Sequence, residues 1–269
     1  MNRAGVQPRL ISGGVFISIV TVCKNNKEGL IRTWESVLLQ ETNDWEWIVI
    51  DGVSVDGTLS FLNELSDPKV TYISEPDKGL YDAMNKGIER SSGQYILFLN
   101  SGDQLQNPDV INLIKHSAKQ NKCPDFLYGD SYEMTLRKDL LYKRARTYRT
   151  LWYGMFTNHQ AMVYKRSSIG DIRYRLEYPI GADYAFTAEI LRTSATSYYI
   201  PKSICIFEQG GLSYTHQKRG EEDQWYIRRD ILRLSWLLRV LIKLLHVTIF
   251  RFKKSFPKYY EKVRFTYGK

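Results

Sequence analysis

The chain has 269 residues, of which 43% are hydrophobic, so it can bury a core, and an intrinsically disordered protein is excluded. This length favours one large α/β domain with an appendage over two independent domains. The three cysteines, Cys23, Cys123 and Cys205, are widely spaced and odd in number, which argues against a disulfide framework or a zinc cluster and indicates a reducing compartment. No N-terminal stretch has the charged, apolar and small-residue order of a signal peptide, so we expect a cytoplasmic protein.

The net charge of +9 is distributed unevenly along the chain. Residues 1–134 contain 12 Lys or Arg and 18 Asp or Glu, whereas residues 135–269 contain 26 and 11. An acidic half joined to a basic half indicates a catalytic or cation-binding part coupled to an anionic surface. The alternative is ordinary variation of surface charge. We expect no nucleic-acid partner, because the first half is acidic and no known nucleic-acid-binding module is present.

Short apolar runs rich in β-branched residues alternate with helical spacing along the front of the chain. The predicted strands are 16–23, 45–50, 70–74 and 95–99, and the helices between them are 27–39, 56–65 and 81–90. This alternation predicts βαβ units, and therefore an α/β fold with a mostly parallel sheet flanked by helices. Further along we expect strands at 126–132, within 157–165 and at 197–207, an extended basic segment at 138–149, and a helix at 181–192.

Polar clusters follow three of the predicted strands. They are Asp51 after the second strand, residues 75–79 after the third and residues 100–103 after the fourth. Open parallel sheets bind ligands beyond the carboxyl ends of their strands, so these clusters predict a binding site at that edge. An acidic residue at a strand end is also a common helix cap or turn residue, which is the alternative for each cluster taken alone.

Several motifs occur in a characteristic order. They are ISIVTVCKN at 17–25, IDGVSVDGT at 50–58, SEPDKGLYDAMNKG at 74–87, LFLNSGD at 97–103, NHQAMVYKR at 158–166, GADY at 181–184 and GGLS at 210–213. In this order the chain resembles the family 2 glycosyltransferases of the GT-A fold, especially those of bacterial exopolysaccharide, O-antigen and colanic-acid synthesis. The resemblance runs from Phe16 to about Glu222. It implies a nucleotide-diphospho-sugar donor (a UDP- or GDP-sugar), a glycan or lipid-linked acceptor and, usually, inversion at the anomeric carbon.

The resemblance also assigns donor-binding residues. It places Thr21 and Asn25 near the nucleoside, and Asp51 beside the base or ribose, where a carboxylate accepts hydrogen bonds from a base N–H or a hydroxyl. The floor of the donor pocket would be shaped by Asp77, Asp82 and Asn85. The alternatives are that Asp51 caps the following turn and that Asp82 and Asn85 support the start of a helix.

The segment Asn100, Ser101, Gly102, Asp103 departs from the family pattern. Many relatives carry an Asp-x-Asp element here, whose carboxylates hold Mg²⁺ or Mn²⁺ against the diphosphate, because hard divalent cations favour oxygen ligands. This chain keeps one carboxylate. The resemblance implies a divalent cation held by Asp103, with Asn100 supplying an amide oxygen or orienting the ribose, and Ser101 belonging to the same donor-binding element.

The catalytic base implied by the resemblance is Asp183, near the start of a helix beyond the sheet. One carboxylate suffices for an inverting displacement, because it removes the acceptor proton while the nucleoside diphosphate leaves. A position in the first turn of a helix favours its ionised form. The alternative is an aspartate that only stabilises the helix start.

Two further segments are implied to surround the acceptor and the leaving group. His159 and Gln160 would line the acceptor side, although a lone histidine is more often structural. Gly210 and Gly211 suit a loop that closes over the diphosphate, and His216 would follow it to neutralise the charge of the leaving group. The alternative is an ordinary exposed basic loop.

The C-terminal segment predicts one long helix over 227–252 that does not span a membrane, since Arg233, Arg239, Lys243 and His246 recur through it. At about 100° per residue, one side carries Arg229, Arg233, Arg239, Lys243 and Arg251, and the other carries Leu234, Leu237, Leu238, Leu241, Leu245 and Ile249. Lysines and aromatic residues then alternate to the end. This pattern predicts an interfacial helix on an anionic bilayer. The alternative is a helix packed on the catalytic domain or on another subunit.

These expectations define an organisation. Residues 1–225 would form the glycosyltransferase domain, with a donor-binding half at 1–134 and an acceptor half at 135–225, and residues 226–269 a basic amphipathic helical tail. The protein would be peripheral on the inner face of the cell membrane. A second hypothesis is a catalytically silent nucleotide-sugar-binding subunit of a partner transferase. The missing carboxylate at Gly102 favours that hypothesis, and Asp183 argues against it.

Overall fold

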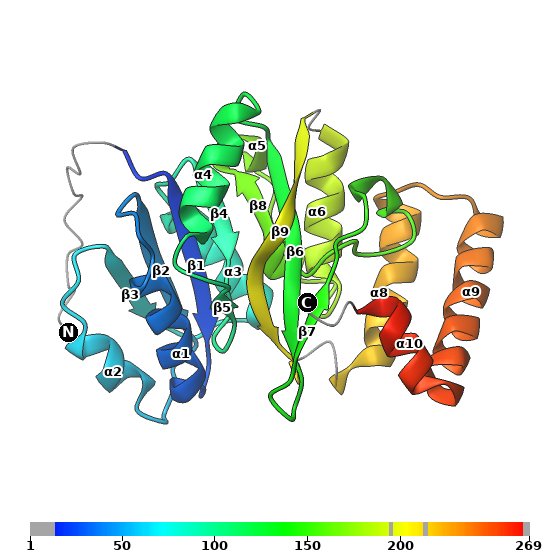
Figure 1. Ribbon diagram of the computed structural model, residues 1–269, viewed down its shortest axis with the longest axis horizontal. Helices are drawn as coiled ribbons and strands as arrows, with labels where there is room; N and C mark the ends of the chain where they lie inside the picture. The colour runs from blue at the N-terminus through cyan, green and yellow to red at the C-terminus, as the bar shows by residue number, and fades with distance from the viewer. Residues whose placement is uncertain (1–13, 194–195, 212–214, 266–269) are drawn as a thin grey trace.

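The computed structural model describes residues 14–193, 196–211 and 215–265, and its centre is a nine-stranded sheet in the order β3-β2-β1-β4-β8-β6-β9-β5, with β7 paired to β6 (Figure 1). The strands are β1 Ile17–Cys23, β2 Trp45–Asp51, β3 Val70–Ser74, β4 Tyr95–Phe98, β5 Gln104–Leu105, β6 Phe126–Met134, β7 Leu140–Lys143, β8 Met162–Lys165 and β9 Ser197–Glu208. The α-helices are α1 Lys27–Leu38, α2 Thr58–Glu64, α3 Leu80–Arg90, α4 Val110–Gln120, α5 Arg166–Ile169, α6 Ala182–Thr193, α8 Gln217–Asp230, α9 Trp236–Ser255 and α10 Pro257–Arg264. Two 3₁₀ turns, η1 Tyr148–Thr150 and η2 His159–Ala161, complete the described elements.

The predicted α/β fold with flanking helices is confirmed, and the sheet as a whole is mixed. Its front half is parallel, since β1 pairs in parallel with β2 and β4, and β2 with β3. In the second half, β6 and β9 are parallel, whereas β8 runs antiparallel to β4 and β6, β7 to β6, and β5 to β9. The expectation of a mostly parallel sheet therefore holds only for the front half. One physical reason is the short hairpin between β6 and β7, because such a connection permits only antiparallel pairing.

Helices cover both faces of the sheet, and each face has its own apolar cluster. Alternate side chains of β2 point to opposite faces, as in any strand. Ile48 and Ile50 join the cluster formed with α3, α6 and α8, and Trp47 and Val49 join the cluster formed with α1, α2 and α4. This arrangement fixes the carboxyl ends of the front strands at one edge, next to the starts of α3 and α6.

The predicted front strands and helices occur where the periodicity placed them, within about one or two residues at their ends. The strands expected at 126–132, within 157–165 and at 197–207 and the helix expected at 181–192 are also present. The extended segment at 138–149 contains the short strand β7 and most of the 3₁₀ turn η1. Helix α4 was not predicted.

The prediction of one continuous helix over 227–252 is wrong. Helix α8 ends at Asp230 and α9 begins at Trp236, and Arg233 between them has a left-handed φ of 54°. The hydroxyl of Ser235 accepts a 3.4 Å hydrogen bond from the N–H of Leu238 and caps the new helix. The proposed domain boundary after residue 225 falls inside α8, and Ile227 of that helix belongs to the core of the sheet.

The side of α9 that faces the protein includes Arg239, Ile242 and His246, whereas Lys243 and Arg251 of the predicted cationic side are exposed. Arg239 is buried with its guanidinium 4.5 Å from the ring of Trp225, and the ring of His246 lies 4.6 Å from that of Tyr153. Most of the leucines point away from the sheet and are exposed. Among the described helices, none is long and apolar enough to cross a membrane.

Candidate active site

A cavity of about 1330 Å³ lies at the carboxyl edge of the front strands. Its walls include the end of β1, the start of α3, the loop after β4, the segment 155–160, the start of α6, the loop after β9 and residues of the C-terminal helices α8, α9 and α10. The predicted residues that line it are Asp77, Asn100, Ser101, Asp103, His159, Gln160, Asp183, Gly210 and Gly211. Residues far apart in the sequence therefore meet around one space, as the polar clusters at the strand ends predicted.

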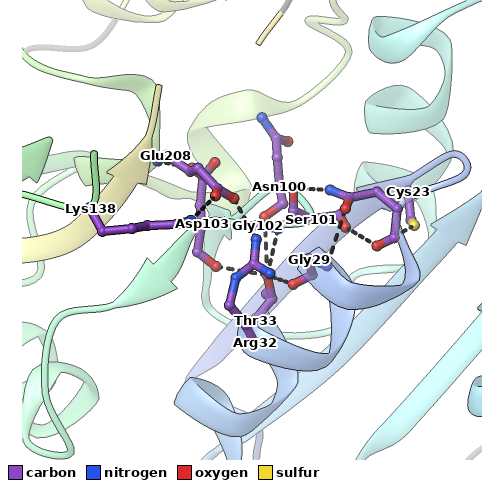
Figure 2. A network of polar contacts seen from close by, with 11 residues as sticks. Cys23, Gly29, Arg32, Thr33, Asn100, Ser101, Gly102, Asp103, Lys138 and Glu208 are labelled. Atoms are coloured by element: carbon purple, nitrogen blue, oxygen red, sulfur yellow. Dashed lines mark hydrogen bonds and ion pairs between the residues drawn. The ribbon is translucent and has the colours of Figure 1, made fainter. Parts of the chain in front are cut away.

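The loop after β4 is fixed to the start of α1 (Figure 2). Asn26 donates a 3.0 Å hydrogen bond to the carbonyl of Ser101, and the Ser101 hydroxyl donates a 3.0 Å bond to the carbonyl of Asn26. Thr33 donates to the carbonyl of Asp103 at 2.7 Å and accepts from the N–H of Gly102 at 3.0 Å. These reciprocal bonds hold the segment 100–103 in one conformation.

Asp103 is a buried carboxylate that has no cationic partner among the residues that the structure describes. Its side chain is 4% exposed and accepts hydrogen bonds from Nε2 of Gln160 at 2.8 Å and from the backbone N–H of Glu208 at 2.9 Å. Within the described residues it forms no ion pair, and burial raises its pKa to about 7. Beside it, Oδ1 of Asn100 is buried and has no hydrogen-bond partner among the described residues. A buried carboxylate that lacks a positive charge, next to an unused amide oxygen, fits a hard divalent cation.

Glu208 was not predicted, yet it occupies the space in front of Gly102. Its carboxylate is held by Arg32 at 2.7 Å and Lys138 at 2.9 Å (Figure 2). Burial opposes ionisation, but these two cations hold its pKa below the usual range. A Cβ on Gly102 would lie 2.6 Å from Oε2 of Glu208, and Gly102 has a φ of +106°. Both the left-handed φ and this close approach favour glycine at residue 102. No local sequence signal identifies a contact between residues so far apart.

Asp183 lies in the first turn of α6 and faces the cavity. It accepts a 2.8 Å hydrogen bond from the N–H of Tyr184, and the hydroxyl of Tyr81 lies 3.4 Å from its Oδ1. Burial raises the pKa of Asp183 to about 6. A carboxylate with that pKa is mostly ionised at neutral pH and is a better proton acceptor than an exposed aspartate.

Asp223 was also missed. It is buried on α8, where its carboxylate accepts 2.9 Å hydrogen bonds from the backbone N–H groups of Ile180 and Gly181 and forms a 3.3 Å ion pair with Arg219. Its sequence context, EED, is typical of an exposed helix surface, which is why no signal distinguished it. Asp223 therefore holds the chain directly before the first turn of α6, which carries Asp183.

The three residues predicted to contact the nucleoside, Thr21, Asn25 and Asp51, are not among those that line the cavity. The buried hydroxyl of Thr21 donates to the carbonyl of Leu99 at 2.7 Å, and Asn25 accepts from the N–H of Val55 at 2.8 Å. Asp51 is fully buried, and its Oδ2 accepts from Ser74, whereas its Oδ1 has no partner among the described residues. Of these three, only Asp51 keeps a side-chain acceptor that the described protein leaves unused.

The predicted donor-binding residues in the segment 75–85 fall into two groups, one that lines the cavity and one that does not. Asp77 lines the cavity and accepts a 2.9 Å hydrogen bond from the N–H of Gly79. Asp82 instead accepts from the N–H of Lys78, and Asn85 makes two hydrogen bonds to the backbone of Tyr174. Neither Asp82 nor Asn85 is among the residues that line the cavity, so their visible contacts support the local fold.

His159, which was predicted to line the acceptor side, is buried between aromatic rings. It stacks on Phe98 with ring centroids 5.2 Å apart and shares a 2.9 Å hydrogen bond with the hydroxyl of Tyr174. Burial lowers its pKa to about 3, so the imidazole is neutral. Gly210 has a left-handed φ of 112°, and His216 stands at the N-cap of α8, outside the residues that line the cavity.

An acidic cavity at the carboxyl edge of an α/β sheet is typical of enzymes that act on nucleotide-bearing substrates. Residues 18–173 match the model of the family Glycosyl transferase family 2. The match covers more than half of the chain, and the chain therefore belongs to this family of glycosyltransferases.

Curated relatives carry consistent names. The chain is 28% identical over 216 residues to a PGL/p-HBAD biosynthesis glycosyltransferase of Mycobacterium bovis (strain BCG / Pasteur 1173P2), with 74% of this chain and 80% of that protein covered. It is 24% identical over 231 residues to the putative teichuronic acid biosynthesis glycosyltransferase TuaG of Bacillus subtilis (strain 168), with 82% and 90% covered.

Solved structures share the fold. TarS 1–349 of S. aureus in complex with UDP-GlcNAc superposes with a TM-score of 0.64 at 15% identity, covering 84% of this chain and 70% of that chain. The mannosyltransferase PcManGT from Pyrobaculum calidifontis, in complex with GDP-Man and Mn²⁺, superposes with a TM-score of 0.62 at 15% identity, covering 83% and 66%. At this identity the likeness establishes the fold alone.

Proposed function

We propose that this glycosyltransferase moves a hexosyl or N-acetylhexosaminyl group from a UDP- or GDP-sugar to a hydroxyl of a glycan or lipid-linked acceptor, with inversion at the anomeric carbon. One observation carries the proposal: Asp183 and the Asn100–Asp103 segment line the same cavity from different elements. We assign Asp183 as the proton acceptor and this segment as the diphosphate-binding element, and their shared cavity supports that assignment. The structures of relatives with UDP-GlcNAc and GDP-Man support a nucleotide-sugar donor.

On the donor side, Asp103 and Asn100 would hold the divalent cation, Mg²⁺ or Mn²⁺. When bound, such a cation neutralises charge on the diphosphate and on the leaving group. The Mn²⁺ in the PcManGT structure supports this assignment. The unpartnered Oδ1 of Asp51 is the acceptor that we assign to a base N–H or ribose hydroxyl. Gly210 and Gly211 would let the loop after β9 approach the diphosphate closely.

On the acceptor side, Asp183 takes the proton of the acceptor hydroxyl. The hydroxyl oxygen attacks the anomeric carbon, the bond from that carbon to the phosphate oxygen breaks, and the nucleoside diphosphate leaves with the bonding electrons. No covalent intermediate on the protein is needed, so a single carboxylate is sufficient. The neutral His159 cannot replace it as a charged group, and together with Gln160 it shapes the wall.

The biological setting that we infer is the synthesis of a bacterial surface polysaccharide or glycolipid at the cytoplasmic face of the cell membrane. The names of the mycobacterial and Bacillus relatives support it. The exposed leucines of α9, bordered by Lys243, Arg251 and Lys254, support peripheral binding to an anionic bilayer.

The catalytically silent subunit is less well supported. The single carboxylate in the segment 100–103 is its main argument, but Asp183 lies in the cavity with the raised pKa expected of a base. A silent subunit has no need of that costly arrangement.

The deciding experiment measures nucleotide release and sugar transfer over a panel of UDP- and GDP-sugars. Membrane lipid extract is the acceptor source, and Mg²⁺, Mn²⁺ or a chelator is added. Release from one donor that needs the cation and is lost in Asp103→Ala and Asp183→Asn is the expected result. Donor binding by calorimetry without release from any donor, with every acceptor fraction of the extract tested, would instead support the silent subunit.

A further inference from the structure

A row of apolar side chains winds around α9 from its outer face to the cavity. Leu237, Leu241, Leu245 and Ile249 are spaced four residues apart, so they form one continuous ridge that turns by about 40° at each step. The exposed fraction falls along the first three, from 62% at Leu237 to 53% at Leu241 and 46% at Leu245. Ile249 is partly buried and lines the cavity.

The inner end of this row meets the mouth of the active-site cavity. Ile249, Phe250, Lys253 and Tyr260 line the same space as Asp183. The ammonium group of Lys253 lies 5.4 Å from the ring centroid of Tyr260. The cation of Lys253 therefore lies close to apolar side chains where α9 and α10 line the cavity. The acceptor side of the cavity is therefore partly built by the C-terminal helices.

The orientation of α9 is fixed by contacts on its inner side. Arg239 and Ile242 are buried, and the cation of Arg239 lies over the ring of Trp225. Because these contacts hold the opposite side, the leucines cannot turn inward without breaking them. Nothing in the described part of the chain covers the outer leucines. The adjoining cations, Lys243, Arg251 and Lys254, are exposed and complement anionic head groups.

We propose that this row is the access path of an acceptor that carries a hydrocarbon chain. The inference rests on the proposed function. The chain of the acceptor lies along the row, with its outer part in the bilayer, while its hydroxyl-bearing head reaches Asp183. Lys253 stands where an anionic group between chain and head would pass. A fully water-soluble glycan has no use for an apolar ridge that leads from an exposed helix face into the cavity.

Two neighbouring leucines provide a matched pair of variants. Leu245 belongs to the row, whereas Leu244 is 59% exposed and lies off it, about 100° away around the helix. Leu245→Gln and Leu244→Gln each remove one leucine from the outer half of the helix and add the same amide. Both should weaken binding to a bilayer to a similar extent. Only Leu245→Gln should interrupt the path into the cavity.

The experiment uses the full chain and a diazirine-bearing farnesyl phosphate, presented in vesicles of equal parts phosphatidylglycerol and phosphatidylcholine. After photolysis, labelled peptides are mapped by mass spectrometry. We expect label on α9 and on the cavity-lining residues Leu136 or Met155. Leu245→Gln should lower the cavity label about fivefold, and Leu244→Gln less than about twofold, at equal vesicle flotation.

Equal loss of cavity label in the two variants would overturn the proposal, as would label confined to residues 237–244 in the unmodified protein. Nucleotide release by the unmodified protein over the panel of UDP-sugars and GDP-sugars separates the two hypotheses. Failure of the proposed function appears there as no release from any donor, whatever the labelling pattern. Failure of the access path appears as one of the labelling outcomes above while the unmodified protein still releases nucleotide from a donor.

Discussion

The carboxylate of Asp223 accepts a 2.9 Å hydrogen bond from the backbone N–H of Gly181, two residues before Asp183. The same oxygen accepts the N–H of Ile180 at 2.9 Å. An anion on α8 thus satisfies donors at the start of α6, where the helix dipole favours negative charge. Helix α8 follows directly on the loop after β9, so this contact joins that loop region to the turn that carries Asp183.

Asp223→Asn should lower kcat about tenfold or more while changing donor affinity little, because the variant loosens the turn that positions Asp183 without touching the donor side. Burial is the main reason why the pKa of Asp183 is raised, and the charge of Asp223 adds to it. The variant should therefore also shift the acid limb of the pH–rate profile to lower pH. Kinetics over a pH series test both effects.

Asp230→Asn is the matched control, since Asp230 lies on the same helix but is exposed and pairs with Arg229. It should leave kcat and the acid limb unchanged. If Asp223→Asn lowered kcat with no shift of the acid limb, Asp223 would be only a fold-stabilising residue and its electrostatic effect on the base would be refuted.

The pH dependence of the unmodified enzyme should report Asp183 directly. Because burial raises its pKa to about 6 and the base must be ionised, kcat should be near its maximum above pH 7 and fall about tenfold per unit well below pH 6. The measurement is made at saturating donor and divalent cation. An activity plateau that continues down to pH 4.5 would show that another group accepts the proton.

Much of the fold could be predicted because its signals are local. Apolar runs such as residues 45–50 define buried strands, and their alternation with helices defines βαβ units. Because the carboxyl ends of parallel strands meet at one edge of a sheet, the sequence alone predicted that Asn100 and Asp103 lie at that edge. Asp183 came from the family resemblance, and its position in the cavity agrees with that expectation.

Glu208, Asp223 and the break of the C-terminal helix were not predicted, because each depends on packing between parts of the chain that are far apart in the sequence or on different helices. Glu208 meets Gly102 only because β9 returns to the sheet beside β5, and Asp223 meets Gly181 only because α8 packs on α6. No periodicity encodes such pairs. The break of the C-terminal helix at Arg233 was missed because residues on both sides favour helices, and the left-handed turn is set by packing of α8 and α9 rather than by a glycine or proline.

Asp183→Asn should lower the rate of sugar transfer by a factor of about 10² to 10⁴. The same variant should also stabilise the folded state at alkaline pH. The folded-state pKa of Asp183 is raised from 3.8 to about 6. The free energy of unfolding therefore falls as the pH rises from about 3.8 to about 6, and the full loss is present above that range. Because asparagine cannot ionise, the variant should have a free energy of unfolding about 1–3 kcal/mol higher than the unmodified protein at pH 8, and nearly the same value at pH 4. Urea unfolding at both pH values measures the difference. An equal change at the two pH values would contradict a desolvated charge as the cause.

Gly102→Ala should destabilise the fold by about 1–3 kcal/mol, because residue 102 has a φ of +106° and its new Cβ would lie 2.6 Å from Oε2 of Glu208. Adding Glu208→Ala removes the steric part and leaves the backbone strain. The double variant should therefore lose less stability than the sum of the two single variants, by about 0.5–1 kcal/mol. Gly14→Ala is the control, since Gly14 has open space around it and no left-handed φ. Strict additivity in urea unfolding would show that Glu208 does not fill the space in front of Gly102. The expected non-additivity would instead show that the Glu208 side chain fills the space that a side chain at residue 102 would need.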